Sequence, residues 1–171
     1  MRFGIVLLVI VGVIVAIAAG AFFGLTRQFT VESRAMEPKV KKGDEVAVFR
    51  FSDSVGPPTR RDVVVLSDRV SPGCAVGGKY SVARIIGLAG ETVTERQGVV
   101  SINGKPLDEG YVKPESRDTR SGTWHVPKGA YLVIGDNRRS ACAAPYVVPK
   151  KNVVGFVIFT YWPFDRIAVG Q

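Results

Sequence analysis

The stretch YSVARIIGLAG, residues 80–90, predicts a β-strand in the middle of this chain. Val82 to Leu88 is rich in β-branched and other apolar residues and has the length of a strand. Similar short segments, bounded by Gly, Pro or Asn, lie on both sides of it: 45–51, 62–66, 92–95, 99–102, 131–134 and 153–161. No amphipathic helical period follows residue 27, so the pattern predicts a mainly β chain with an antiparallel sandwich or barrel-like core.

The polar middle of the chain differs from the rest in its turns. Gln97-Gly98 and Asn103-Gly104 each separate two short strand-like segments, which is typical of β-hairpins. We therefore expect a small hairpin-rich subdomain at 91–127, carried on a β core built from 28–90 and 128–171.

The N-terminal segment, 1–27, is not globular in pattern. Phe3–Leu25 is 23 residues without a charge, or roughly 34 Å as a helix, against a hydrocarbon core of about 30 Å. A cleaved secretory signal, with Ala16-Ile17-Ala18 as its A-x-A site, is the alternative, but its apolar region is usually only about 7–15 residues. We expect an uncleaved transmembrane helix, although arginines on both sides leave its orientation poorly fixed.

Composition limits the partners. Beyond the apolar segment there are 22 Lys and Arg residues against 15 Asp and Glu, and such a domain beside a bilayer is attracted to anionic lipid head groups. The basic residues are scattered and form no stripe with interleaved aromatics, so nucleic-acid binding is not expected. Two cysteines and one histidine are too few for a structural zinc site, and we expect neither metal nor cofactor.

Several short motifs occur in one order behind the apolar segment. They are SRAMEP at 33–38, KGD at 42–44, RRDVVV at 60–65, ARIIGLAGE at 83–91, VSINGKPL at 100–107 and GDNR at 135–138. Each is weak alone, but together they resemble the signal peptidase I family of membrane-bound serine endopeptidases, and GDNR is the most specific of them.

This resemblance implies a serine–lysine dyad, in which a lysine amine removes the proton of a nucleophilic serine. Ala35 stands at the nucleophile position and Ala83 at the general-base position, while Ser33 stands where the family places an oxyanion-hole hydroxyl. Loss of a nucleophile or base costs about 10⁶ in rate in well-studied serine proteases, so this chain is expected to be inactive as written. The residues implied around the base are Arg84, Asp136, Arg138 and Ser140.

No other residues replace the dyad convincingly. Lys79 lies about 13 Å along a strand from Ala83, too far to fill the vacancy. Cys142 with His125, and Asp136 with Glu37, lack the local motifs of a catalytic pair. The family pattern is also lost after Arg138, where Ser140 comes one position early. Both origins of the alanines remain open: substitution in an active peptidase, or a natural non-catalytic paralogue.

The family resemblance implies a role, a place and partners. An active member removes signal peptides from secreted preproteins, and binds them as an added β-strand with small-residue pockets. The chain would be a single-pass protein of a bacterial plasma membrane, with the β domain on the extracytoplasmic side. The alternative is a non-catalytic paralogue that binds signal peptides or partners an active peptidase. In that compartment Cys74 and Cys142 could form a disulfide, two unpaired thiols being the alternative.

Overall fold

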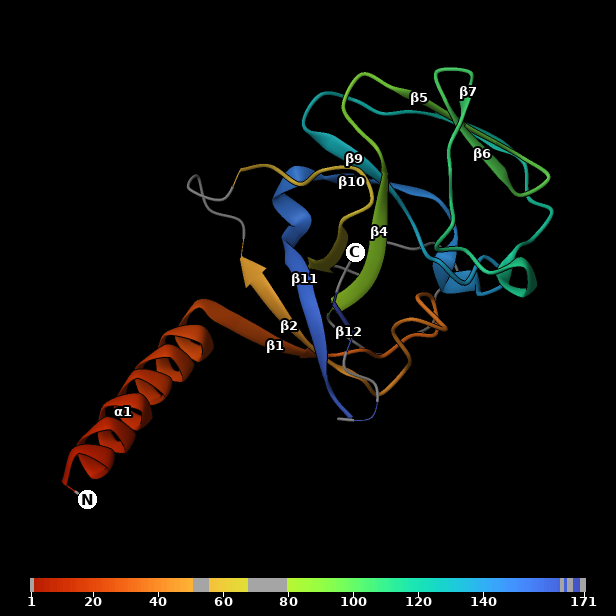
Figure 1. Cartoon of the computed structure of the whole chain (residues 1–171). Coiled ribbons are helices and arrows are strands. Elements are labelled where there is room, and N and C mark those ends of the chain that lie inside the picture. The colour runs from red at the N-terminus through yellow and green to blue at the C-terminus, as the bar shows by residue number, and fades with distance from the viewer. Residues whose placement is uncertain (1, 51–55, 68–79, 164, 166–167, 170–171) are drawn as a thin grey trace.

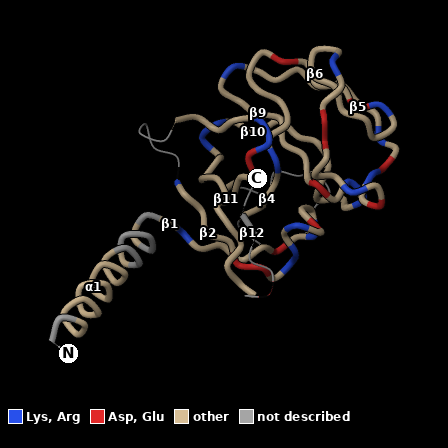
Figure 2. The backbone as a smooth tube through the Cα atoms, viewed as in Figure 1, with Lys and Arg blue, Asp and Glu red and all other residues tan. Residues whose placement is uncertain are grey.

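The structure is a computed structural model that describes residues 2–50, 56–67, 80–163, 165 and 168–169, except some side chains of the first helix. An N-terminal helix, α1 (Arg2–Leu25), projects from a β domain (Figure 1). Within the described residues, no helix combines the length and hydropathy needed to cross a membrane, so the expected span is not confirmed. Lys and Arg are spread widely over the β domain (Figure 2).

The β domain contains two antiparallel sheets, which confirms the mainly β fold class. The larger, eight-stranded sheet has the order β1-β2-β11-β3-β4-β9-β10, with β12 paired to β11. Its strands are β1 (Thr26–Thr30), β2 (Glu45–Arg50), β3 (Val63–Ser67), β4 (Tyr80–Gly87), β9 (Ala130–Ile134), β10 (Tyr146–Pro149), β11 (Val153–Trp162) and β12 (Ala168–Val169).

The apolar run in β3 is buried on both of its faces. Val63 and Val65 belong to one hydrophobic cluster, which also contains Val82, whereas Val64 and Leu66 belong to another. Side chains alternate across a strand, so a strand packed on both faces must be apolar at every position. β3 pairs with β11 on one side and with β4 on the other, and this places β4 well inside the sheet.

The smaller sheet is formed by strands between residues 92 and 125, in the order β7-β6-β5-β8. Its strands are β5 (Thr92–Arg96), β6 (Val99–Ile102), β7 (Lys105–Pro106) and β8 (Gly122–His125). Val93 and Val100 from this sheet share a buried cluster with Ile86, Leu132 and Ile134 of the larger sheet. The two sheets are therefore joined by an apolar contact rather than by the chain alone.

Short 3-10 helices interrupt the loops of the described part of the chain. They are η1 (Pro114–Ser116), η2 (Ala141–Ala143) and η3 (Lys150–Asn152). The second of them directly follows the GDNR turn, and so it helps to set the geometry of the candidate site.

Candidate active site

The Ser33–Pro38 segment follows β1 and turns beneath the larger sheet. Ala35 and Met36 are buried, and Met36 packs in the same cluster as Val31 and Val82. The backbone N–H of Ala35 donates to the Ser33 hydroxyl over 3.4 Å, so this hydroxyl and this amide lie side by side. A hydroxyl and a backbone N–H are the donor types that stabilise an oxyanion in acyl transfer.

The GDNR turn holds this segment from the other side. The backbone N–H of Asn137 donates to the Ala35 carbonyl over 2.8 Å, and its side-chain amide donates to the Arg34 carbonyl over 3.0 Å. Gly135 is required by this approach, because a Cβ there would lie 2.5 Å from the Ala35 carbonyl oxygen and 2.5 Å from the Ala143 Cβ. The turn therefore fixes the backbone at Ala35.

Ala83 lies in β4, paired with Val64 of β3, and its side chain is buried. It belongs to an apolar cluster with Tyr131, Val133 and Tyr146. Burial raises the pKa of the Tyr146 hydroxyl to about 12, although the neighbouring Ser81 hydroxyl lowers it. Tyr146 therefore stays protonated at neutral pH and cannot act as a general base in place of a lysine.

The two family-like segments come together in the structure. Phe29 of β1 and Tyr80 of β4 meet edge to face, with ring centroids 4.7 Å apart. Further in, Val31 and Met36 share a cluster with Val82, the residue before Ala83. Residues 29–36 are thus neighbours of Tyr80 and Val82, some 50 positions away in the sequence. Ala83 belongs to the other buried cluster, and no contact recorded among the described residues joins it to Ala35.

Arg84 and Asp136 form a buried ion pair beside this contact. Arg84 Nε and Nη2 donate to the two carboxylate oxygens of Asp136 over 2.8 and 2.6 Å, and both side chains are 1% exposed. Arg84 Nη1 donates to the Arg61 carbonyl over 2.7 Å, and the guanidinium carbon lies 4.3 Å from the Tyr111 ring centroid. A bidentate pair of this kind is both strong and directional. It fastens the GDNR turn to β4.

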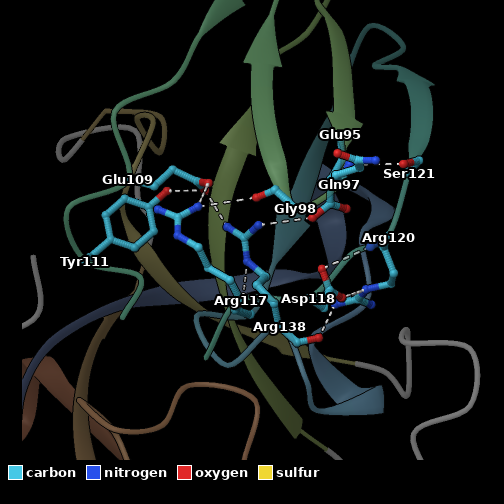
Figure 3. A network of polar contacts seen from close by, with 11 residues as sticks. Glu95, Gln97, Gly98, Glu109, Tyr111, Arg117, Asp118, Arg120, Ser121 and Arg138 are labelled. Carbon is cyan, nitrogen blue, oxygen red and sulfur yellow. Dashed lines mark hydrogen bonds and ion pairs between the residues drawn. The ribbon is translucent and has the colours of Figure 1, made fainter. Parts of the chain in front are cut away.

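Arg138 extends the network to the smaller sheet (Figure 3). Its Nε donates to the Gly135 carbonyl over 2.8 Å, Nη1 lies 3.4 Å from Glu95 Oε1, and Nη2 pairs with Glu109. Burial raises the pKa of Glu95, against the effect of the Arg138 charge. Burial also raises the pKa of Tyr111, whose hydroxyl donates to Glu109. This network supports the turn, and none of the bonds recorded for the Arg138 side chain involves residue 35 or 83.

Ser140 takes no part in that network through its side chain in the bonds that the structure records. Its backbone N–H donates to the Asn137 carbonyl over 2.9 Å, and its own carbonyl accepts from Ala143. Cys74, one half of the predicted bridge with Cys142, lies outside the described residues, so that disulfide stays a prediction. In the described ranges, no group of three or more His, Cys, Asp or Glu side chains is placed to hold a metal ion.

Sequence reasoning missed three residues of this site. Glu95 and Glu109 are partners of Arg138 from 43 and 29 positions away. Tyr146 packs beside Ala83 from a different strand. No local motif marks any of them; the only signal was that buried arginines need partners.

A hollow of about 640 Å³ lies beside β1, and neither Ser33 nor Ala35 is among its lining residues. Its walls come from β1, β2, β3, β4 and β11, and include Phe29, Tyr80 and Val154. Glu32, the residue before Ser33, also lines it. β1 is the outermost strand of the larger sheet and is mostly exposed, so one row of its backbone groups is available to a further strand.

Several known proteins are similar to this chain in sequence. Signal peptidase I of Leptolyngbya laminosa is 30% identical over 161 residues, covering 92% of this chain and 79% of that protein. Signal peptidase I of Bacillus caldolyticus is 31% identical over 155 residues, covering 82% and 81%. The crystal structure of a signal peptidase I from Enterococcus faecalis V583 aligns at 31% identity over 59% of this chain and 97% of that chain, with a TM-score of 0.46.

The family model described as signal peptidase, peptidase S26, matches residues 3–162, which is nearly the whole chain. Together with the relatives at about 30% identity, this match confirms the resemblance seen in the motifs. The chain belongs to the signal peptidase family, peptidase S26.

Proposed function

We propose that this chain binds signal peptides as a signal peptidase I-type protein and, as written, does not cleave them. The observation that carries the proposal is the pairing of the Ser33 hydroxyl with the Ala35 amide, next in the chain to Glu32, which lines the hollow. A hydroxyl and a backbone N–H are the donor types of an oxyanion hole, and the GDNR turn holds this segment in place.

An extended peptide suits the hollow better than a compact ligand. It can add to the free edge of β1, which supplies main-chain hydrogen bonds, while alternate side chains enter the hollow. Continuing in the same direction, it would bring a carbonyl group to Ser33 and Ala35. Small residues of the A-x-A type fit this role because they let the peptide backbone come close to the strand.

Catalysis is missing for a chemical reason. The methyl group of Ala35 has no lone pair for attack on a carbonyl, and that of Ala83 has none to accept a proton. Binding and oxyanion stabilisation alone leave about 10³–10⁴ of rate enhancement over water in proteases that lack their triad. Restoring Ala35→Ser and Ala83→Lys would supply the missing nucleophile and base.

Of the two origins of the alanines, the packing supports a natural non-catalytic paralogue. A lysine shortened to alanine leaves room for about four heavy atoms, yet Ala83 is buried in one cluster with Tyr131, Val133 and Tyr146. Such a paralogue would capture signal peptides or assist an active peptidase. The domain division at 91–127 and the roles of Ser33, Ala35 and Ala83 are parts of this proposal.

We also propose that α1 is the membrane anchor and that the β domain is extracytoplasmic, in a bacterial plasma membrane. The support is the uncharged stretch Phe3–Leu25, whose length suits a bilayer. Extraction of the full chain from membranes by carbonate would contradict the anchor, whereas extraction by detergent alone would support it.

Peptide binding is the direct test. The full chain in detergent should bind a fluorescent peptide with an A-x-A segment, measured by anisotropy, and should bind a matched peptide with Leu in place of both alanines much more weakly. Equal binding of the two peptides, or no binding, would contradict the proposed function. The double variant A35S/A83K tests the two origins: efficient precursor cleavage by it would favour an altered peptidase over a paralogue.

A further inference from the structure

Two arginines of the hollow lack the ion pairs that most other arginines make. Arg27 and Arg50 both line it and are exposed, and the structure records no carboxylate partner for either within the described residues. Elsewhere in the domain arginine side chains pair with Asp or Glu: Arg34, Arg60, Arg61, Arg84, Arg117, Arg120 and Arg138. The hollow thus presents two guanidinium groups to whatever occupies it.

Strand geometry places these two arginines on one face of the sheet. Arg27 is directly opposite Val48 in the β1–β2 pairing, and Arg50 follows Val48 by two residues. Residues two apart on a strand, and residues directly opposite across a pair, point to the same face. Phe29, two residues after Arg27, is on that face as well, and its ring contacts Tyr80. The arginines and the aromatic pair therefore line the hollow together.

The charged side chains that line the hollow carry a small net positive charge. Glu32 is the one carboxylate among its lining residues, so three ionisable groups with opposite signs leave one net positive charge. Guanidinium groups bind carboxylates through paired hydrogen bonds, and low-dielectric walls strengthen the field inside a cleft. Glu32 adjoins Ser33, whereas Arg27 lies at the other end of β1, beside α1.

We propose that this hollow selects extended peptides that carry an acidic side chain upstream of their small-residue segment, with Arg27 and Arg50 binding the carboxylate. This inference rests on the proposed function, because it assigns a preference to the same peptide groove. A peptide added alongside β1 sends alternate side chains to the arginine face. The preference should therefore depend on the position of the acid with a period of two residues.

The experiment is a charge scan of one peptide. A fluorescent A-x-A peptide carries a single Glu at each upstream position in turn, and matched peptides carry Gln or Lys there. On the full chain in detergent, we expect Glu to tighten binding about three- to tenfold over Gln at alternate positions, which is the scale of one or two exposed charge pairs. The gain should shrink in 0.5 M salt because exposed charges are screened.

Variants assign the preference to the two arginines. Arg27→Gln and Arg50→Gln should each reduce the ratio of Glu-peptide affinity to Gln-peptide affinity, measured within the same variant. Arg96→Gln is the matched control, because Arg96 is an exposed arginine of β5 that does not line the hollow, and it should leave the ratio unchanged.

The outcomes separate this inference from the proposed function. If the Gln peptide binds but Glu brings no gain at any position, or a gain survives both arginine substitutions, the acidic preference is wrong and peptide binding stands. A preference for Lys would likewise overturn it and point to Glu32. If none of the A-x-A peptides binds, the proposed function fails, and the inference fails with it.

Discussion

Arg84 and Ala83 are consecutive residues of β4, yet their surroundings are opposite in kind. The Arg84 guanidinium donates hydrogen bonds to the Asp136 carboxylate and the Arg61 carbonyl, and it stacks on the Tyr111 ring. Ala83 belongs to a buried, mainly apolar cluster that also holds Tyr131 and Tyr146. Buried ion pairs therefore hold the GDNR turn to β4 on one side of this strand, and apolar packing dominates on the other.

The buried ion pairs and the apolar cluster around Ala83 are separate parts of the site. The ion pairs form a frame that joins β4, the GDNR turn and the smaller sheet, and none of them involves position 35 or 83. The residues that hold the GDNR turn in place can therefore be altered independently of positions 35 and 83.

Breaking the frame should have the largest effect. Asp136→Ala leaves the Arg84 guanidinium buried without its carboxylate, and removal of one partner from a buried pair costs about 3–5 kcal/mol. The measurement is the free energy of unfolding from urea titration. Asp108→Ala is the control: Asp108 pairs with Arg61 at the surface, so its loss should cost less than about 1 kcal/mol. Similar costs for both variants would contradict a structural role for the frame.

The apolar side should resist a restored lysine. Ala83→Lys adds three methylenes and an amine within the cluster that contains Tyr146, and overpacking of this kind costs about 1–3 kcal/mol before the buried charge is counted. Removing the neighbouring ring in Ala83→Lys/Tyr146→Ala should make the double variant more stable than the sum of the single effects predicts, by more than about 0.5 kcal/mol.

A control position shows whether that coupling is local. Ala47 of β2 is also buried but does not belong to the cluster of Tyr146, so Ala47→Lys and Tyr146→Ala should be additive. Additivity at position 83 as well would show that Tyr146 does not occupy the space of the base. It would remove the packing argument for a natural paralogue.

The strands that sequence predicted and those it missed differ in what decides them. β3 was predicted within one residue because Val63 to Leu66 are apolar and all buried. β6 (Val99–Ile102) was predicted because the Gln97-Gly98 and Asn103-Gly104 turns bound it, although Val99 is exposed. β1 was missed because TRQFT is polar, and it is a strand because β2 pairs with it. β8 (GTWH) and β10 (YVVP) were missed because each is only four residues long, and pairing with β5 and β9 makes them strands.

The site shows the same division. The family resemblance predicted that the 33–38 and 80–90 segments belong together, and the structure places Met36 and Val82 in one buried cluster. It also predicted that Arg84, Asp136 and Arg138 matter, but not their mutual partners. Glu95 and Glu109 could not be found, because a carboxylate in a strand or loop looks the same whether it faces water or a buried arginine.

The pH dependence of stability tests Glu95, a buried carboxylate of the ion-pair network with one unbonded oxygen among the described residues. Glu95 is fully buried, and its Oε2 has no hydrogen-bond partner among the described residues, so burial raises its pKa above the usual 4.5. The folded state then binds the proton more tightly than the unfolded state. Stability due to this group is present below pH 4.5 and is lost as pH rises through the folded pKa.

The measurement is the free energy of unfolding of the unsubstituted chain minus that of Glu95→Gln, followed from pH 4 to 8. We expect this difference to fall as pH rises. Glu91→Gln gives the opposite sign: although burial raises the pKa of Glu91, the bonds from Arg60 and the Leu88 amide lower it overall. Its difference should therefore grow as pH rises from acid. Parallel curves for the two variants would contradict the assignment of Glu95.

The smallest effect concerns the backbone that serves Arg84. Arg61 has a φ of 79°, a conformation that costs a non-glycine residue about 1–2 kcal/mol, and it aims its carbonyl at Arg84 Nη1. Arg61→Gly adopts this φ freely and loses only a surface pair with Asp108, so we expect a gain of about 0.5 kcal/mol in the free energy of unfolding. Arg61→Ala removes the same side chain but keeps the strained φ, so it should bring no gain. If Arg61→Gly is less stable than Arg61→Ala, the positive φ at residue 61 is not a source of strain in the folded state.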